Sequence, residues 1–163
     1  YDTDRKILGI LEEGFLSHDT EIGIDLGIAR FLDPKLAIIN EDFLINGQHR
    51  AVTAFDSLIS TPVKVFGRVS LLREARVFHD KINARIKYPD GTMHLLNDVF
   101  SIVSRGPGGG QVTARGDSGA VVLDENGVPL GMIIGGNGNF SYAMKFSNVF
   151  DANKPFSEYF FKI

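Results

Sequence analysis

The sequence has no cysteine and no tryptophan among its 163 residues. Without cysteine the chain forms no disulfide, no thiolate nucleophile and no cysteine-ligated metal site. Disulfides mark oxidising compartments, so their absence favours an intracellular location. Long hydrophobic runs are lacking too, because charged and polar residues interrupt every apolar stretch well before the length of a membrane-spanning helix. We therefore expect no membrane partner, and nothing in the composition predicts a cofactor.

An excess of charge of one sign is also lacking. Lys and Arg number 17 and Asp and Glu number 20, which gives a net charge of −3. Surfaces that bind nucleic acids or anionic membranes carry clustered positive charge. We therefore expect no nucleic-acid partner.

The chain does contain enough apolar residues for a core, and many short β-type runs. Hydrophobic residues make up 44% of it and include 13 phenylalanines. Short apolar runs separated by Gly, Pro, Asn and Asp, with little helical periodicity, predict an all-β barrel or sandwich. A moderate helical pattern at 148–161 predicts a short C-terminal helix. The predicted strands are 6–11, 22–31, 36–39, 63–66, 75–79, 83–88, 95–103, 119–123, 128–134 and 140–145. Two of the connections between them, 89–92 and 124–127, have the composition of hairpin turns.

The most informative segment is Ala114-Arg115-Gly116-Asp117-Ser118-Gly119, which precedes an apolar strand. Glycines on both sides of Ser118 allow a sharp turn that places backbone N–H groups beside the hydroxyl. Such N–H groups stabilise the oxyanion that forms when a serine attacks a carbonyl. The alternative is an ordinary turn, since glycine and small polar residues dominate turns.

The upstream run Arg105-Gly106-Pro107-Gly108-Gly109-Gly110 lacks the Lys-Ser/Thr pair that a phosphate-binding loop requires. We interpret it as a flexible loop.

Gly116-Asp117-Ser118-Gly119 resembles the GDSG core of chymotrypsin-like, trypsin-fold serine proteases. The segment 62–70 is similar to the V-K-x-G-R-T-x-G stretch of bacterial and plant-type members, and the likeness extends loosely over 22–150. It implies a double β-barrel serine endopeptidase in which Ser118 is the nucleophile. It also implies an oxyanion hole formed by the amides of Gly116 and Ser118, and an internal salt bridge for Asp117.

The same resemblance implies that Asp25 orients the catalytic histidine, because 25–29 is similar to the family's D-x-A-[LIV]-[AL] stretch. A carboxylate within an apolar strand is costly to bury without a partner. The alternative is a strand-edge carboxylate that pairs with Arg30 or stays exposed.

The histidine base is not evident. None of His18, His49, His79 and His94 lies in the family's T-A-A-H-C context. His79 and His94 lie at predicted strand ends in the C-terminal half, where the family places no base. His18 or His49 could serve as the base, at a position that differs from the family's usual one.

We instead expect the base to come from an N-terminal polypeptide segment outside this sequence. Only about half of a first barrel precedes the inter-barrel connection, and Tyr1 would then be a processing site. The expected organisation is a remainder of the N-terminal barrel at 1–45, a connection at 46–61, and the C-terminal barrel with its helix at 62–163.

By the same resemblance, a peptide or protein substrate contacts a set of residues near the nucleophile and adds a strand to the sheet. Neighbouring positions carry no charge, so we expect a neutral or apolar P1 side chain. Two further hypotheses stay open: a catalytically inactive peptide-binding module on the same fold, and a structural β-domain. The expected substrate-binding residues are Val112, Thr113, Ile133, Ile134 and Gly135.

Overall fold

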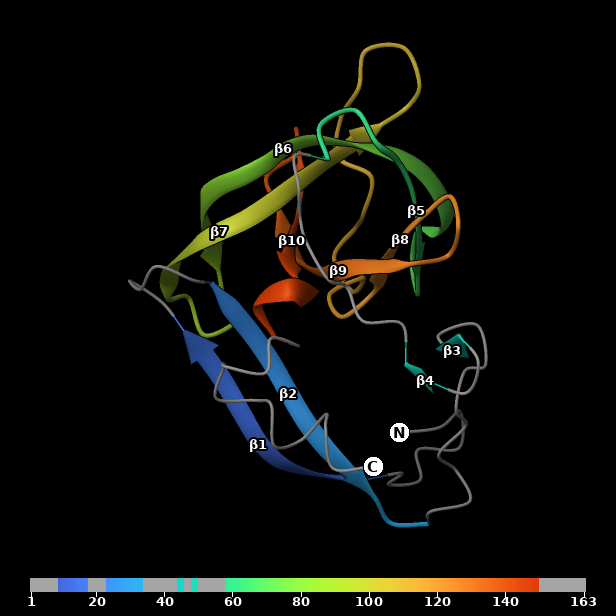
Figure 1. Ribbon diagram of the computed structural model, residues 1–163. Coiled ribbons are helices and arrows are strands. Elements are labelled where there is room, and N and C mark those ends of the chain that lie inside the picture. The colour runs from blue at the N-terminus through green and yellow to red at the C-terminus, as the bar shows by residue number, and fades with distance from the viewer. Residues whose placement is uncertain (1–8, 18–22, 34–43, 46–47, 50–57, 150–163) are drawn as a thin grey trace.

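The computed structural model describes residues 9–17, 23–33, 44–45, 48–49 and 58–149 (Figure 1). Within them, ten strands and one short 3-10 helix are found. The elements are β1 (Gly9–Ser17), β2 (Ile24–Phe31), β3 (Leu44–Ile45), β4 (Gln48–His49), β5 (Pro62–Gly67), β6 (Leu71–Lys87), β7 (Met93–Ser104), β8 (Val121–Asp124), β9 (Pro129–Gly136), β10 (Ser141–Lys145) and η3 (Phe146–Asn148).

Strands β5 to β10 form a closed antiparallel barrel in the order β10-β7-β6-β5-β8-β9. The all-β prediction is therefore confirmed. Both predicted hairpin turns are also confirmed, one joining β6 to β7 and the other joining β8 to β9.

One long strand, β6, replaces two predicted strands. Its 17 residues run through the polar pair Asp80-Lys81, which the sequence suggested as a break. The pairing of β6 with β7 shifts register three times between Val77 and Ala84. Such bulges bend a strand without ending it, so the polar residues are accommodated within the ladder.

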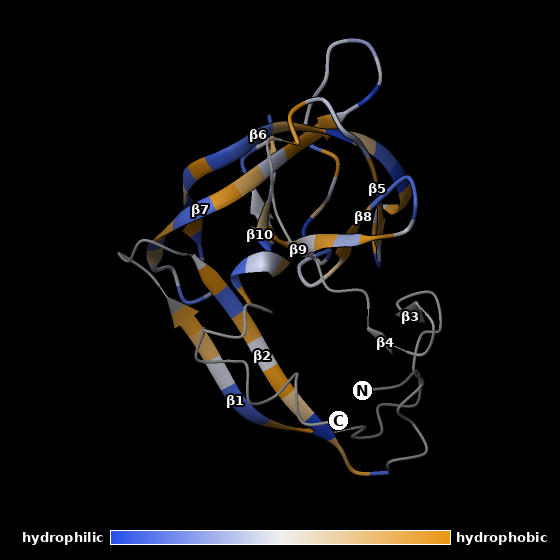
Figure 2. Cartoon of the chain, in the orientation of Figure 1, coloured by the Kyte–Doolittle hydropathy of each residue, from blue (hydrophilic) through white to orange (hydrophobic). Residues whose placement is uncertain are grey.

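Alternating side chains of β5 and β6 fill the barrel. Val63, Val65, Ala75 and Val77 are all at most 1% exposed, and they pack with Phe100 of β7. Side chains two positions apart in a strand point to the same face, which explains the alternation of hydrophobic and hydrophilic residues along β6 (Figure 2).

Strands β1 and β2 form a separate two-stranded ribbon beside the barrel (Figure 1). The Gly23 amide donates a hydrogen bond to the Asn97 carbonyl, with a nitrogen–oxygen distance of 2.5 Å. Ile24 is buried in a cluster that includes Leu96 and Val99 of β7. The start of β2 is thus fixed to the barrel.

Two predicted elements lie wholly or mostly outside the described residues. The predicted strand 36–39 is not among them, and neither are residues 150–163, which contain most of the predicted C-terminal helix. Where the predicted C-terminal helix would begin, the chain forms the short 3-10 helix η3.

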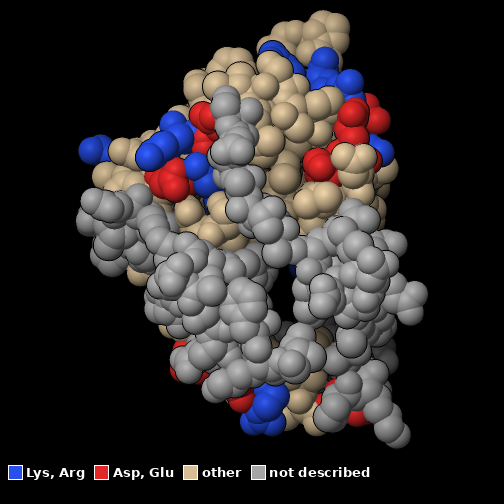
Figure 3. All heavy atoms as spheres, in the orientation of Figure 1, with Lys and Arg blue, Asp and Glu red and all other residues tan. Residues whose placement is uncertain are grey.

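On the face shown in Figure 3, positive and negative side chains of the described residues lie interspersed over the barrel. No helix in the described ranges has both the length and the hydropathy to cross a membrane.

Candidate active site

Ser118 lies in the connection between β7 and β8, and its side chain is exposed. Gly116 and Gly119 have φ angles of +103° and +91°, a region that L side chains rarely adopt. The Gly119 amide donates to the Ile133 carbonyl at 2.8 Å, and the Ile133 amide donates to the Ala120 carbonyl at 2.8 Å. The loop is therefore fixed to β9 directly after the serine.

Asp117 anchors the other side of this loop from a position only 1% exposed. Its Oδ1 atom accepts hydrogen bonds from the amides of Val69 at 2.7 Å and Ser70 at 3.2 Å. Its Oδ2 atom accepts one from the Ala114 amide at 2.8 Å. Both carboxylate oxygens are thus satisfied, mainly by the turn between β5 and β6.

The same environment sets the charge of this carboxyl. Burial alone would raise the pKa of Asp117, but hydrogen bonds from the Ser70 side chain and from the backbone of Ala114, Val69 and Ser70 outweigh it and lower the pKa to about 2. The implied salt bridge is replaced by these hydrogen bonds, because no ion pair of Asp117 occurs among the described residues.

Close packing holds the β5–β6 turn against the loop. A Cβ atom added to Gly67 would lie 2.5 Å from the Asp117 carboxyl carbon. A Cβ atom added to Gly116 would lie 3.0 Å from a methyl group of Val69. Glycine at position 67 lets the turn approach the carboxylate closely enough to donate its hydrogen bonds.

The amides of Gly116 and Ser118 make no hydrogen bond to any described residue. The intervening Asp117 amide is occupied, since it donates to the Ala114 carbonyl at 3.1 Å. Two N–H groups of the loop that carries the exposed Ser118 side chain are therefore not occupied by described residues.

The segment before the loop is fixed by Ser141 of β10. The Ser141 Oγ atom accepts hydrogen bonds from the amides of Val112 and Thr113, both at 3.0 Å, and lies 2.8 Å from Thr113 Oγ1. Gln111 adds a second tie, since its Nε2 donates to the Thr113 carbonyl and its Oε1 accepts from the Gly138 amide, both at 2.5 Å.

The expected substrate-binding side chains are mostly buried. Val112, Thr113, Ile133 and Ile134 are each at most 8% exposed, and the two isoleucines belong to the barrel core. Among these expected residues, the backbone atoms of β9 are then better placed than the side chains to contact a peptide. Gly135 pairs with Tyr142 of β10 on one edge, and beyond Ile133 no described strand pairs with the other edge of β9.

Asp25 contacts the barrel through Tyr88. The hydroxyl of Tyr88, the residue directly after β6, donates a hydrogen bond to Asp25 Oδ2 at 2.5 Å. Burial and the Asp25 carboxylate raise the pKa of Tyr88 above its usual value. The alternative partner, Arg30, instead pairs with Glu12 at 2.6 Å. No hydrogen bond joins Asp25 to Ser118, and Asp25 Oδ1 has no hydrogen bond within the described ranges.

The histidines with described side chains have other partners. His79 Nδ1 lies 2.9 Å from Ser101 Oγ, and His94 Nε2 lies 3.0 Å from Thr92 Oγ1. His18 lies outside the described residues, and only the backbone of His49 is described, in β4. The described part of the chain therefore places no imidazole against Ser118.

No family model matches this sequence, and the comparison with curated proteins gives no match. Among solved structures, the chain is similar to a glutamic-acid-specific serine protease that uses a histidine triad in substrate binding. The identity is 18%, the TM-score is 0.57, and the match covers 93% of this chain and 74% of that one. The chain has a trypsin-like, all-β fold. A weaker likeness, to the 2A protease from human rhinovirus C15, has 17% identity and a TM-score of 0.44, and it covers 63% of this chain and 68% of that one.

Within this fold, sequence reasoning missed the contacts that shape the loop. The donors to Asp117 are backbone amides of a turn 47 and 48 positions earlier in the chain. Ser141 and Tyr88 lie in no sequence motif that would mark them as functional. The one available signal in the sequence is the segment 62–70, whose family resemblance does not reveal that it forms this turn.

Proposed function

We propose that this chain is the catalytic part of a serine endopeptidase and that Ser118 is its nucleophile. The observation that carries this proposal is an exposed Ser118 side chain in a loop where the amides of Gly116 and Ser118 have no described partner. The buried Asp117 carboxylate holds this loop in place. Such an arrangement suits the stabilisation of negative charge on a carbonyl oxygen.

In the proposed reaction, Ser118 Oγ attacks the scissile carbonyl carbon while a histidine takes its proton. The amides of Gly116 and Ser118 hold the resulting oxyanion. The leaving amine takes the proton from the histidine as the peptide bond breaks, and water then hydrolyses the acyl-enzyme. Asp25 orients the histidine through Oδ1, the oxygen that Tyr88 does not occupy.

We assign the base to a histidine of an N-terminal segment that completes the first barrel, with His18 and His49 as alternatives within this sequence. Substrate backbone pairs with β9 at Gly135, on the edge opposite the one that β10 occupies. The segment 112–114 contains no charged side chain, which suits a neutral or apolar P1 residue.

A fluorophosphonate probe tests the nucleophile, because it modifies only an activated serine. We expect labelling of the natural protein at Ser118, identified by peptide mass mapping, and its loss in Ser118→Ala. The control is Ser60→Ala, an exposed serine before β5 that lies outside the nucleophile loop and should leave labelling unchanged. Labelling at another residue, or none in the natural protein, would contradict the proposal.

A peptide-binding module is the second candidate, because the described residues place no histidine against Ser118. It predicts that an extended peptide binds equally well to the wild-type chain and to Ser118→Ala, and that neither is labelled. Labelling of Ser118 would exclude it.

A further inference from the structure

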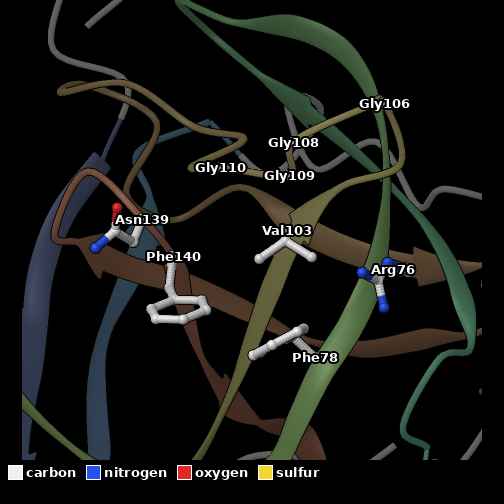
Figure 4. Close-up of a pocket in the computed structure, with 9 residues that line it drawn as sticks. All are labelled: Arg76, Phe78, Val103, Gly106, Gly108, Gly109, Gly110, Asn139 and Phe140. Carbon is white, nitrogen blue, oxygen red and sulfur yellow. The ribbon is translucent and has the colours of Figure 1, made fainter.

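A second candidate site is a pocket of about 380 Å³ whose lining does not include Ser118. Its walls come from β6, β7, the glycine-rich loop after β7 and the turn before β10. Figure 4 shows the phenyl rings of Phe78 and Phe140 near one another, with Gly108, Gly109 and Gly110 across the pocket from them. Nothing in the proposed peptidase mechanism uses these residues.

Aromatic rings form one wall of this pocket. The rings of Phe78 and Phe140 are stacked, with centroids 5.3 Å apart and an interplanar angle of 29°. His79 supports both edge-on, at 4.5 Å from Phe78 and 5.5 Å from Phe140. Phe78 is nevertheless 37% exposed. A supported and partly exposed ring pair presents a rigid surface on which a further aromatic group can stack.

The pocket also carries a positive charge that no described carboxylate neutralises. The Arg76 guanidinium carbon lies 5.6 Å from the Phe78 centroid, which holds the side chain at the aromatic wall. The acidic residue two positions earlier, Glu74, is contacted instead by Arg105 at 4.0 Å. Arg105 also contacts Glu125, at 3.7 Å. Arg76 is therefore available to bind the carboxylate of a ligand. Its planar guanidinium group can donate two parallel hydrogen bonds to the two oxygens of a carboxylate.

We propose that this pocket binds an aromatic carboxylate, with the ring against Phe78 and Phe140 and the carboxylate on Arg76. Two sources share this chemistry: a free aryl-alkanoate, and the C-terminal aromatic residue of a peptide. The proposal does not depend on Ser118 being a nucleophile.

Isothermal titration calorimetry with 3-phenylpropanoate and its uncharged amide tests the proposal. A ligand of this size should bind with a dissociation constant of about 1 mM. We expect the amide to bind at least about tenfold more weakly, because it loses a charge-assisted hydrogen bond to Arg76. Tripeptides ending in phenylalanine, with a free or amidated C-terminus, distinguish the two sources: tighter binding of the free tripeptide than of 3-phenylpropanoate indicates a peptide C-terminus, and weaker binding indicates a small molecule.

Two variants locate the site. Arg76→Gln should weaken 3-phenylpropanoate about tenfold, and Phe78→Leu should weaken the acid and the amide alike because both lose the ring contact. The matched control is Arg85→Gln, at an exposed arginine of the same strand that does not line the pocket. Ser118→Ala should bind as the wild type does, which separates this site from the candidate active site.

Equal affinity for the acid and the amide, or unchanged binding by Arg76→Gln, would overturn the proposal. Absence of binding at 3-phenylpropanoate concentrations about tenfold above the expected dissociation constant would do the same. Thermal melting of each variant shows whether a loss of binding reflects the pocket or a loss of the fold. If Arg76→Gln does not fold, the comparison of acid with amide on the wild-type chain decides alone.

Discussion

Asp117 is the residue on which the geometry of the candidate active site depends. Its carboxylate joins the amides of Val69 and Ser70 to that of Ala114, so it connects two loops that are distant in sequence. The motif identified this acid as structural, and its burial is consistent with that role. The partners were not predictable, because backbone amides leave no mark on the sequence.

Asp117→Asn should destabilise the fold and impair the candidate oxyanion site together. An amide keeps one acceptor oxygen and turns an NH₂ group toward amides that need an acceptor, so we expect a loss of about 1–3 kcal/mol in the free energy of unfolding. The rate of probe labelling at Ser118 should fall as well. Urea denaturation and labelling kinetics measure the two effects.

Asp124→Asn is the matched control, since Asp124 also accepts backbone hydrogen bonds, from Asn126 at 2.8 Å and Val128 at 2.7 Å, but in the β8–β9 turn. It should leave labelling unchanged. Equal labelling rates in the wild type and Asp117→Asn would show that the carboxylate does not position the loop.

The low pKa of Asp117 predicts an acid-dependent loss of stability. Its folded-state pKa is about 2, whereas its ordinary value is 3.8. Because the folded state favours the ionised form, this contribution is complete above pH 4 and disappears as the pH falls through 2. The difference corresponds to about 2 kcal/mol at neutral pH. Unfolding measured between pH 7 and pH 1.5 should show that the wild type and Asp117→Asn converge in acid, and a constant difference would contradict the assignment.

At the scale of elements, the sequence predicted turns better than strand continuity. The β6–β7 hairpin has Gly91 at φ +91°, and the β8–β9 hairpin has Gly127 at φ +78°. Glycine marks such positions because a Cβ atom is strained there. In contrast, Asp80-Lys81 suggested a break, although bulges carry β6 through it. Pairing with β7 decides this outcome, and local composition does not encode it.

The β5–β6 turn is the element that supports the nucleophile loop, and Gly67→Ala tests it. The added methyl group would lie 2.5 Å from the Asp117 carboxyl carbon, so the turn or the carboxylate must move. We expect a loss of about 1–3 kcal/mol in stability and slower labelling of Ser118. Thermal melting and labelling kinetics provide the readouts.

Gly14→Ala is the corresponding control, because no atom lies within 4 Å of the position that its Cβ would take. Its melting temperature and labelling should match the wild type. If Gly67→Ala behaves in the same way, the close approach of the turn is not needed.

At the scale of the whole molecule, described residues of the β1–β2 segment contact the barrel, among them Phe15 and Leu26, which pack against its buried cluster. Further contacts include Ile24 in the barrel core, the Gly23–Asn97 hydrogen bond, and the bond from Tyr88 to Asp25. The expected first-barrel remainder at 1–45 is described only in part, so the division into domains stays a prediction. Contacts between strands that are far apart in the sequence produce no local sequence pattern, so the contacts between the β1–β2 ribbon and the barrel could not be predicted.

Asp25 and Tyr88 therefore give a test that spans both parts of the molecule. If Asp25 orients the catalytic histidine, Asp25→Asn should slow probe labelling by roughly a thousandfold or more. Tyr88→Phe keeps that carboxylate and removes one hydrogen bond, so it should cost about 1 kcal/mol in stability and leave most of the labelling rate. Because the folded state raises the pKa of Tyr88, its contribution should be present up to pH 10 and decline as the pH rises further. Tyr88→Phe should accordingly approach the wild type in stability above pH 10. Equal labelling of Asp25→Asn and Tyr88→Phe would indicate that Asp25 serves only to attach the ribbon to the barrel.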